Sequence, residues 1–215
     1  MNIKAIILDF DGVIVESVGI KDAAFKELFK GYPQQFDEII AYHIENNATI
    51  RFEKFKHITE NILKQPFTPE REAQLCQDYS NYIVGKIIAA PFVEGLEDFL
   101  KEYAPQMTFY IATVNPEDEF QRILIAKKIA QYFKKVYTYP WKKVDAFREI
   151  LKQEGFSAEQ VIYVGDTQQD YLAAKETGVH FIGRDSGRPF EDANVLVCKD
   201  FCEIKQAIQR SAYVR

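Results

Sequence analysis

The sequence predicts an α/β fold, a doubly wound parallel sheet with a bundle of four helices inserted into it. Two observations predict this. After Pro91, short and almost wholly apolar runs alternate with segments of helical periodicity, as expected for strands covered on both faces. From about Ser17 to Ala89, in contrast, the periodicity is helical throughout.

The short apolar runs are the predicted strands. They cover residues 3–8, 107–112, 136–139, 161–164, 179–182 and 195–197. The helical stretches between them cover residues 96–103, 117–129, 144–154, 168–177 and 201–210. A helix between each strand and the next indicates parallel strands joined by right-handed crossovers. We expect the first strand to join this sheet across the helical insertion.

The insertion carries four amphipathic segments. Their apolar stripes run through residues 20–28, 36–44, 52–63 and 75–87. Gly, Pro and Asn residues separate them, and Thr68 before Pro69 is typical of a helix N-cap. We therefore expect an α/β core domain of residues 1–16 and 89–215, and a helical domain of residues 17–88.

Composition limits the class of protein. A chain of 215 residues with 47% hydrophobic residues is large enough to bury a core. Its net charge of −5 argues against nucleic acid or an anionic membrane as a partner. No apolar run approaches the roughly 20 residues of a membrane span. The N-terminus also lacks a secretion signal, so we expect a cytoplasmic protein. The oligomeric state is not indicated.

Polar side chains follow four of the predicted strands. In chain order they are Asp9 and Asp11; Thr113, Val114 and Asn115; Lys142 and Lys143; and Asp166 with Asp170. In doubly wound sheets ligands bind at the carboxyl ends of the strands, so these residues should converge. Crowded carboxylates call for a hard cation, and Mg²⁺ fits best. A hydroxyl, backbone N–H groups and a Lys would hold phosphate oxygens, so the pattern indicates phosphoryl transfer.

Taken singly, each of these features also has a structural interpretation. Asp11 with Gly12 suits a β-hairpin turn, and Thr113 suits a strand end. Thr167 and Asp170 have the spacing of a capping box. Paired lysines usually lie on a solvated face. It is their joint occurrence, in order and each at a strand end, that favours the functional interpretation.

Four motifs carry a family resemblance. The segments DFDGVIVES, FYIATVN and VGDTQQD, with a Lys before the last, resemble the signature motifs of the haloacid dehalogenase (HAD) superfamily of phosphohydrolases. The helical insertion resembles the α-helical cap of many members. The resemblance covers essentially the whole chain. It implies a HAD-like core and a Mg²⁺-dependent phosphatase of a small phosphorylated metabolite, phosphoglycolate-like or sugar-phosphate-like.

The resemblance also implies roles for the acids. Asp9 would be the nucleophile that forms an aspartyl-phosphate, and Asp11 the general acid and base. Asp9, the backbone carbonyl of Asp11 and Asp166 would hold Mg²⁺, with Asp170 supporting the metal site from behind. The segment after Asp11 would form a small hairpin flap.

The phosphoryl group would be bound by Thr113, Val114, Asn115 and Lys143. Lys142 is the alternative to Lys143, which is preferred by its spacing from Pro140. Substrate choice would depend on polar residues of the helical domain, and the candidates are Lys21, His43, Asn47 and Arg51. Each of these also fits a structural or surface role.

Three other functions remain open. The first is a sugar-phosphate mutase of the same superfamily, a branch that typically has a His where this chain has Lys21. The second is a phosphometabolite-binding module without turnover, although the pair Asp9 and Asp11 argues against it. The third is a phosphoacceptor receiver domain, but receivers place the acceptor Asp on a middle strand and lack a helical insertion.

Overall fold

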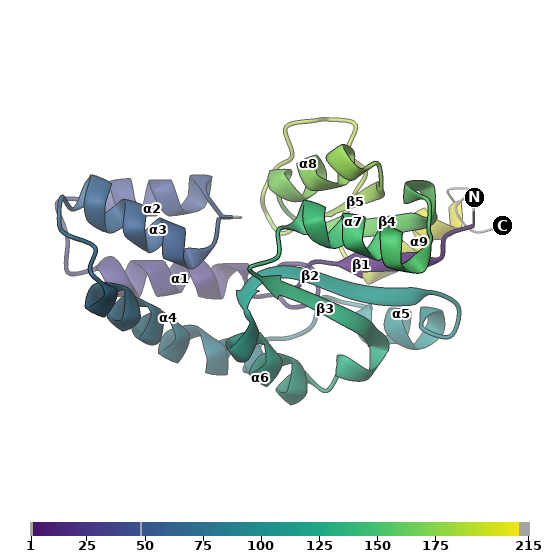
Figure 1. Ribbon diagram of the computed structural model, residues 1–215, viewed down its shortest axis with the longest axis horizontal. Helices are drawn as coiled ribbons and strands as arrows, with labels where there is room; N and C mark the ends of the chain where they lie inside the picture. The colour runs from purple at the N-terminus through teal and green to yellow at the C-terminus, as the bar shows by residue number, and fades with distance from the viewer. Residues whose placement is uncertain (1, 48, 211–215) are drawn as a thin grey trace. The chain divides into compact units, whose positions relative to one another are not determined.

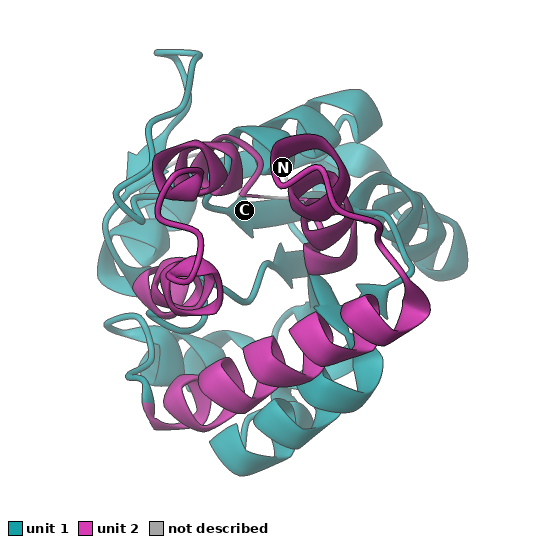
Figure 2. Cartoon of the chain, turned by 90° about the vertical axis from the view of Figure 1, so that its left-hand side faces the viewer, with its two compact units in different colours: residues 1–16, 90–215 teal, residues 17–89 magenta. Residues whose placement is uncertain are grey.

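The structure is a computed structural model that describes residues 2–47 and 49–210. The chain divides into two compact units, residues 1–16 with 90–215, and residues 17–89 (Figure 2). The second boundary falls one residue later than the sequence predicts, because the last helix of the insertion continues to Ala89. No helix among the described residues is long and apolar enough to span a membrane.

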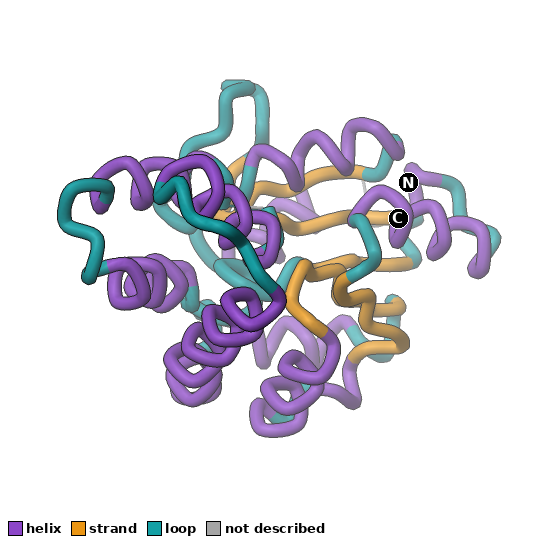
Figure 3. The backbone as a smooth tube through the Cα atoms, turned by 60° about the vertical axis from the view of Figure 1, so that its left-hand side comes forward, coloured by secondary structure: helices purple, strands orange, loops and turns teal. Residues whose placement is uncertain are grey.

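The first unit is built on one parallel sheet of six strands, as predicted. Its order is β3-β2-β1-β4-β5-β6. Figure 3 shows the strands in orange. The strands are β1 (Ala5–Leu8), β2 (Thr108–Pro116), β3 (Phe133–Tyr139), β4 (Val161–Gly165), β5 (His180–Arg184) and β6 (Val197–Cys198). Leu8 pairs with Ile111 on one side and Val164 on the other, so β1 is central and its carboxyl end is flanked by β2 and β4.

Helices cover both faces of this sheet. They are α5 (Leu96–Tyr103), α6 (Glu117–Lys127), α7 (Lys143–Glu154), α8 (Gln168–Thr177) and α9 (Phe201–Arg210). In Figure 1, α7 and α8 lie above the sheet and α5 and α6 below it. Tyr163 of β4 and Phe147 of α7 pack on the first face, with ring centroids 4.5 Å apart. Phe99 of α5 packs against Phe109 and Phe201 on the other.

The second unit contains the four predicted helical segments. They are α1 (Val18–Phe29), α2 (Phe36–Glu45), α3 (Arg51–His57), which continues as a π-helical segment (Ile58–Ile62), and α4 (Pro69–Ala89). Phe25, Phe55 and Tyr79 form an aromatic cluster in which the ring centroids lie 5.4 to 5.7 Å apart. The Thr68 Oγ1 accepts a hydrogen bond of 3.3 Å from the N–H of Arg71, as expected of an N-cap.

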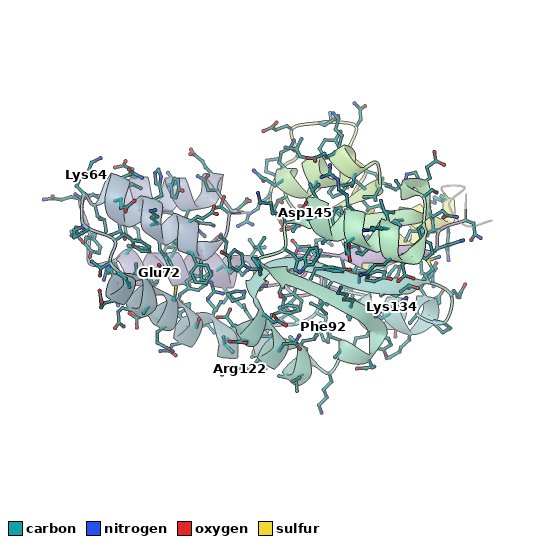
Figure 4. The ribbon with its side chains drawn as sticks, viewed as in Figure 1. Lys64, Glu72, Phe92, Arg122, Lys134 and Asp145 are labelled. Carbon is teal, nitrogen blue, oxygen red and sulfur yellow. The ribbon has the colours of Figure 1, made fainter. Side chains whose placement is uncertain are left out.

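Strands β2 and β3 are each three residues longer than the sequence predicts. β2 runs on to Pro116 through an irregularity in its pairing with β3, so residues 113–115 lie within the strand rather than after it. β3 begins at Phe133, before the predicted start. The exposed Lys134, labelled in Figure 4, hid this beginning, and Lys residues are common on edge strands such as β3.

The predicted hairpin flap after Asp11 is wrong. Residues 10–16 form a compact turn, here called the Asp11 turn, with isolated bridges from Val15 to Asp11 and to Phe92 in place of a paired ladder. The carbonyl of Phe10 accepts hydrogen bonds from the N–H groups of Ile14 and Val15 at 2.8 and 3.1 Å. These hydrogen bonds to one carbonyl close the turn within a few residues, which leaves too few residues for paired strands. Gly12 adopts a φ of +76°, which favours glycine there.

Candidate active site

Asp9 directly follows the central strand β1 and is buried, with 7% of its surface exposed. Its Oδ1 accepts a hydrogen bond of 2.7 Å from the N–H of Phe10. Its Oδ2 accepts one of 2.8 Å from the Lys143 Nζ. Burial raises the pKa of Asp9 to about 6, although Lys143 opposes the rise. The carboxylate is therefore fixed in orientation and only weakly stabilised in its charged form.

Lys143 is the first residue of α7, and its ammonium group joins two acids. It lies 2.8 Å from Asp9 Oδ2 and also contacts Asp170 Oδ1. Burial lowers the pKa of this lysine, but the carboxylates of Asp170 and Asp9 outweigh burial and hold it above its ordinary value. Lys142, the residue before it, is exposed. Of the two lysines considered from the sequence, only Lys143 reaches Asp9 through a described contact.

Asp170 lies in the first turn of α8 and is fully buried. Besides Lys143, its carboxylate accepts hydrogen bonds from the Tyr163 hydroxyl at 2.6 Å and the Thr167 hydroxyl at 2.7 Å. The N–H groups of Asp166 and Thr167 add bonds of 3.2 and 3.1 Å. A carboxylate has about four lone-pair positions, so these donors occupy all of them. The carboxylate of Asp170 therefore orients the side chains of Lys143, Tyr163 and Thr167.

The local sequence explains this arrangement. Thr167 and Asp170 form a capping box, as their spacing predicts, so the structural interpretation of Asp170 is compatible with a place in the site. Gly165 is required for the close approach, because a Cβ at that position would lie 2.4 Å from the Cβ of Asp170.

Asp166 follows β4 and is buried, with 2% exposure. Its Oδ2 has no hydrogen-bond partner within residues 2–47 and 49–210. One carboxylate oxygen from each of Asp9, Asp166 and Asp170 lies within 4.8 Å of the others. Burial, Asp9 and Asp170 raise the pKa of Asp166 to about 7. A buried acid with an unused oxygen beside two further acids is an arrangement that fits a bound cation.

Asp11 and Asn115 come from neighbouring elements and meet directly. The Asn115 side-chain N–H₂ group donates to Asp11 Oδ2 at 2.8 Å and to the Thr113 Oγ1 at 2.9 Å. Both Asn115 and Thr113 are buried on β2, with Val114 half-buried between them. The side chain of Asn115 therefore orients Asp11 and Thr113. The sequence predicts only phosphate binding by Asn115 and does not indicate this contact with Asp11.

The specificity candidates lie in the helical unit. His43 of α2 is buried, stacks on Phe25 with centroids 3.8 Å apart, and lies 3.0 Å from Asp22 through its Nε2. Arg51 of α3 is also buried, and its Nη1 donates to the Ser80 Oγ at 3.1 Å. Both side chains thus have packing partners inside the unit.

The other two candidates are less enclosed. Lys21 lies half-buried on α1. Asn47 follows α2, and its carbonyl accepts a hydrogen bond of 3.4 Å from the buried Lys54. The role of all four residues in substrate choice stays a prediction.

Two residues at the site, Tyr163 and Arg184, are not predicted from the sequence. Tyr163 lies inside an apolar run and has the pattern of a core residue, yet its hydroxyl bonds Asp170. Arg184 ends β5 and bonds the Asp11 turn, 172 residues away in the chain from Gly12. Only the Tyr hydroxyl in a run of aliphatic residues was a local signal, because a buried Tyr hydroxyl usually has a partner.

Comparison with known proteins identifies the family. The model of haloacid dehalogenase-like hydrolases matches residues 6–184. A phosphoglycolate phosphatase of Vibrio cholerae is 26% identical over 192 residues, covering 85% of this chain and 84% of that protein.

Two solved structures share the fold. One, described as a predicted phosphoglycolate phosphatase from Haemophilus somnus, has a TM-score of 0.78 at 18% identity, covering 97% of this chain and 99% of that one. A β-phosphoglucomutase from Clostridium difficile has a TM-score of 0.77 at 17% identity, covering 98% and 97%. With most of its length matched by the family model, this chain belongs to the haloacid dehalogenase-like hydrolases.

Proposed function

We propose that this hydrolase is a Mg²⁺-dependent phosphatase that removes phosphate from a small metabolite through an aspartyl-phosphate on Asp9. One observation carries the proposal. Asp9 and Asp11, two residues apart, are each held by a different partner, Asp9 by Lys143 and Asp11 by Asn115. Separate anchoring suits two carboxyl groups with separate tasks.

In the first step, a carboxylate oxygen of Asp9 attacks phosphorus, and the bond between phosphorus and the leaving oxygen breaks. Asp11, in its protonated form, gives its proton to that oxygen. The substrate leaves as an alcohol, and the phosphoryl group stays on Asp9. Proton transfer of this kind typically contributes about 10² to 10⁴ in rate.

In the second step, Asp11 acts as a base. Its carboxylate takes a proton from a water molecule, whose oxygen attacks phosphorus, and the bond between phosphorus and Asp9 breaks. Phosphate is released, and Asp9 and Asp11 return to their starting forms. The hydrogen bond from Asn115 to Asp11 Oδ2 holds the carboxyl group in place while it loses and regains its proton.

The phosphoryl oxygens would be bound by Thr113 and Lys143. The Thr113 hydroxyl oxygen accepts from Asn115, so its own proton can point to a phosphate oxygen. The ammonium group of Lys143 already lies on the carboxylate that would carry the phosphoryl group. We expect the backbone N–H groups of Val114 and Asn115 to assist.

The donor set fits Mg²⁺. Asp9 and Asp166 would hold it together with the backbone carbonyl of Asp11, and Asp170 would support them from behind, since its oxygens are already bonded. The ion would offset negative charge on the phosphoryl oxygens and draw the group toward Asp9. The unpartnered oxygen of Asp166 supports this assignment.

A small phosphorylated metabolite is the substrate class we propose, and the name of the Vibrio cholerae relative favours a phosphoglycolate-like compound. The test is phosphate release from a panel of phosphoglycolate, sugar phosphates, nucleotides and 4-nitrophenyl phosphate, with Mg²⁺ or with chelator. Release that requires Mg²⁺ and disappears in Asp9→Asn is the expected result. Release that persists in folded Asp9→Asn would refute the role of Asp9.

The mutase alternative predicts a different product. A mutase returns the phosphoryl group to a sugar, so isomerised sugar phosphate would accumulate faster than free phosphate. We favour the phosphatase, because Lys21 stands where mutases of the superfamily typically have His.

A further inference from the structure

Arg184, the last residue of β5, is buried and makes four hydrogen bonds. Its Nη1 donates to the carbonyl of Gly12 at 3.0 Å and to Glu16 Oε2 at 2.9 Å, and its Nη2 contacts Glu16 Oε1. Its Nε donates to the carbonyl of Lys199 at 3.2 Å. The guanidinium group thus joins β5, the residue after β6 and both halves of the Asp11 turn.

The position of these contacts is informative. Gly12 directly follows Asp11 in the chain, and Glu16 is the last residue of the Asp11 turn. Backbone contacts also hold the turn: the Phe10 carbonyl accepts from its N–H groups, Val15 bridges both Asp11 and Phe92, and the Glu16 N–H donates to the Pro91 carbonyl at 3.1 Å. Arg184 adds side-chain hydrogen bonds to this backbone framework. A planar guanidinium that bonds both Gly12 and Glu16 restricts the orientation of the turn more than a single hydrogen bond would.

We propose that Arg184 is a positioning residue for Asp11: through the Gly12 carbonyl and Glu16 it holds the Asp11 turn in the orientation from which Asp11 exchanges protons with the leaving oxygen and with water. This inference rests on the proposed function. Asn115 bonds the Asp11 side chain, and Arg184 bonds the carbonyl of Gly12, the residue that follows Asp11.

The experiment compares two leaving groups. The leaving group of an alkyl phosphate is a strongly basic alkoxide unless an acid protonates its oxygen, whereas the 4-nitrophenolate of an aryl ester leaves with little help from an acid. A displaced Asp11 therefore slows formation of the aspartyl-phosphate from the alkyl ester far more than from the aryl ester. A general loss of folded structure would slow both equally.

The variants are Arg184→Met, Arg184→Lys and a control, Arg148→Met. Arg148 forms an exposed ion pair of 2.8 Å with Glu176 on the surface, so the control makes the same chemical change away from the turn. We expect Arg184→Met to lower kcat/KM for the most active alkyl phosphate of the panel by about 10- to 100-fold. For 4-nitrophenyl phosphate we expect a loss within about threefold. Arg184→Lys keeps the positive charge but loses the paired N–H donors of the guanidinium. We expect it to lower kcat/KM for the alkyl ester more than for the aryl ester, by a smaller ratio than Arg184→Met.

Equal losses with both esters in Arg184→Met and Arg184→Lys would overturn the inference, as would no loss in either variant. Hydrogen exchange of residues 10–16 gives a second readout that requires no turnover. It should accelerate in both Arg184 variants and stay unchanged in Arg148→Met, and unchanged exchange in all three would also overturn the inference. A folded wild type inactive on every ester would instead refute the proposed function, while the exchange data would still test the grip of Arg184.

Discussion

The Lys143 Nζ lies 2.8 Å from the Asp9 Oδ2, joining the first residue of α7 to the residue that follows β1, 134 positions earlier in the chain. The same ammonium group contacts Asp170 at the start of α8. One cation thus serves two buried acids, and the effects of changing any of the three residues should be coupled.

Replacing Lys143 by Met should remove phosphatase activity more than any other change outside the acids. It deprives two buried carboxylates of their cation and takes a ligand from the phosphoryl group, so we expect kcat to fall by about 10²- to 10³-fold. The matched control is Lys142→Met, which makes the identical change one residue earlier on an exposed side chain. Steady-state kinetics check both. A similar loss in the two variants would show that the position of Lys143 is not what matters.

The buried acids of the proposed metal site predict a pH dependence of stability. In the metal-free protein the pKa values of Asp9 and Asp166 are raised from 3.8 to about 6 and about 7 by burial. The folded state therefore binds more protons than the unfolded state between about pH 4 and 7, and its stability falls as pH rises through that window. Mg²⁺ should raise the Tm strongly at pH 8 and weakly at pH 5, because protons compete with it.

The variant Asp166→Asn separates the two contributions. It removes a buried charge that is costly without metal, so the metal-free Tm at pH 8 should rise above that of the wild type. The response of the Tm to Mg²⁺ should disappear in the same variant. Differential scanning calorimetry with and without Mg²⁺ measures both quantities. A lower metal-free Tm, or an undiminished response to Mg²⁺, would argue against Asp166 as a ligand.

Tyr163→Phe tests the support behind Asp170. The change deletes one hydroxyl and leaves the packed ring, so we expect a loss of about 1 to 2 kcal/mol in the free energy of unfolding. Asp170 would hold Lys143 less firmly, and kcat should fall by several-fold while KM changes little. Tyr110→Phe is the control, because it also removes a buried tyrosine hydroxyl from the same core cluster. Among the described contacts, the Tyr110 hydroxyl does not bond Asp170. Equal effects of the two changes on kcat would contradict a specific role of Tyr163.

Asn115→Ala tests the anchor of Asp11. It removes the amide that donates to Asp11 Oδ2 and to the Thr113 Oγ1, so both proton transfer and phosphate binding should weaken. We expect kcat/KM for an alkyl phosphate to fall by about 10-fold or more. Because Arg184 acts on the same turn, the double variant with Arg184→Met should lose less than the two single losses combined. Fully additive losses would mean that the two residues act on different groups.

The sequence predicts the sheet and the residues at its carboxyl edge well, because both depend on local patterns. Apolar runs indicate the strands, and polar residues that end them, such as Asp9 and Asp166, must lie near one edge in a parallel sheet. The start of β3 was missed because the charged Lys134 on an edge strand breaks the apolar pattern.

Side-chain partners are harder to predict, since no local pattern encodes them. Lys143, the first residue of α7, contacts Asp9, whereas Lys142 precedes the helix and is exposed. Arg184 and Glu16, 168 positions apart in the chain, meet only once β1 and β5 have taken their places in one sheet.

The most direct test of the central claim is a rapid acid quench of Asp11→Asn with 4-nitrophenyl phosphate. This ester needs little acid to depart, so Asp9 should still be phosphorylated, while hydrolysis of the aspartyl-phosphate should stall without the base. We expect a burst of one 4-nitrophenolate per active site and phosphate recovered on the peptide that contains Asp9. A steady release without a burst in this folded variant, or phosphate bound to another residue, would contradict it.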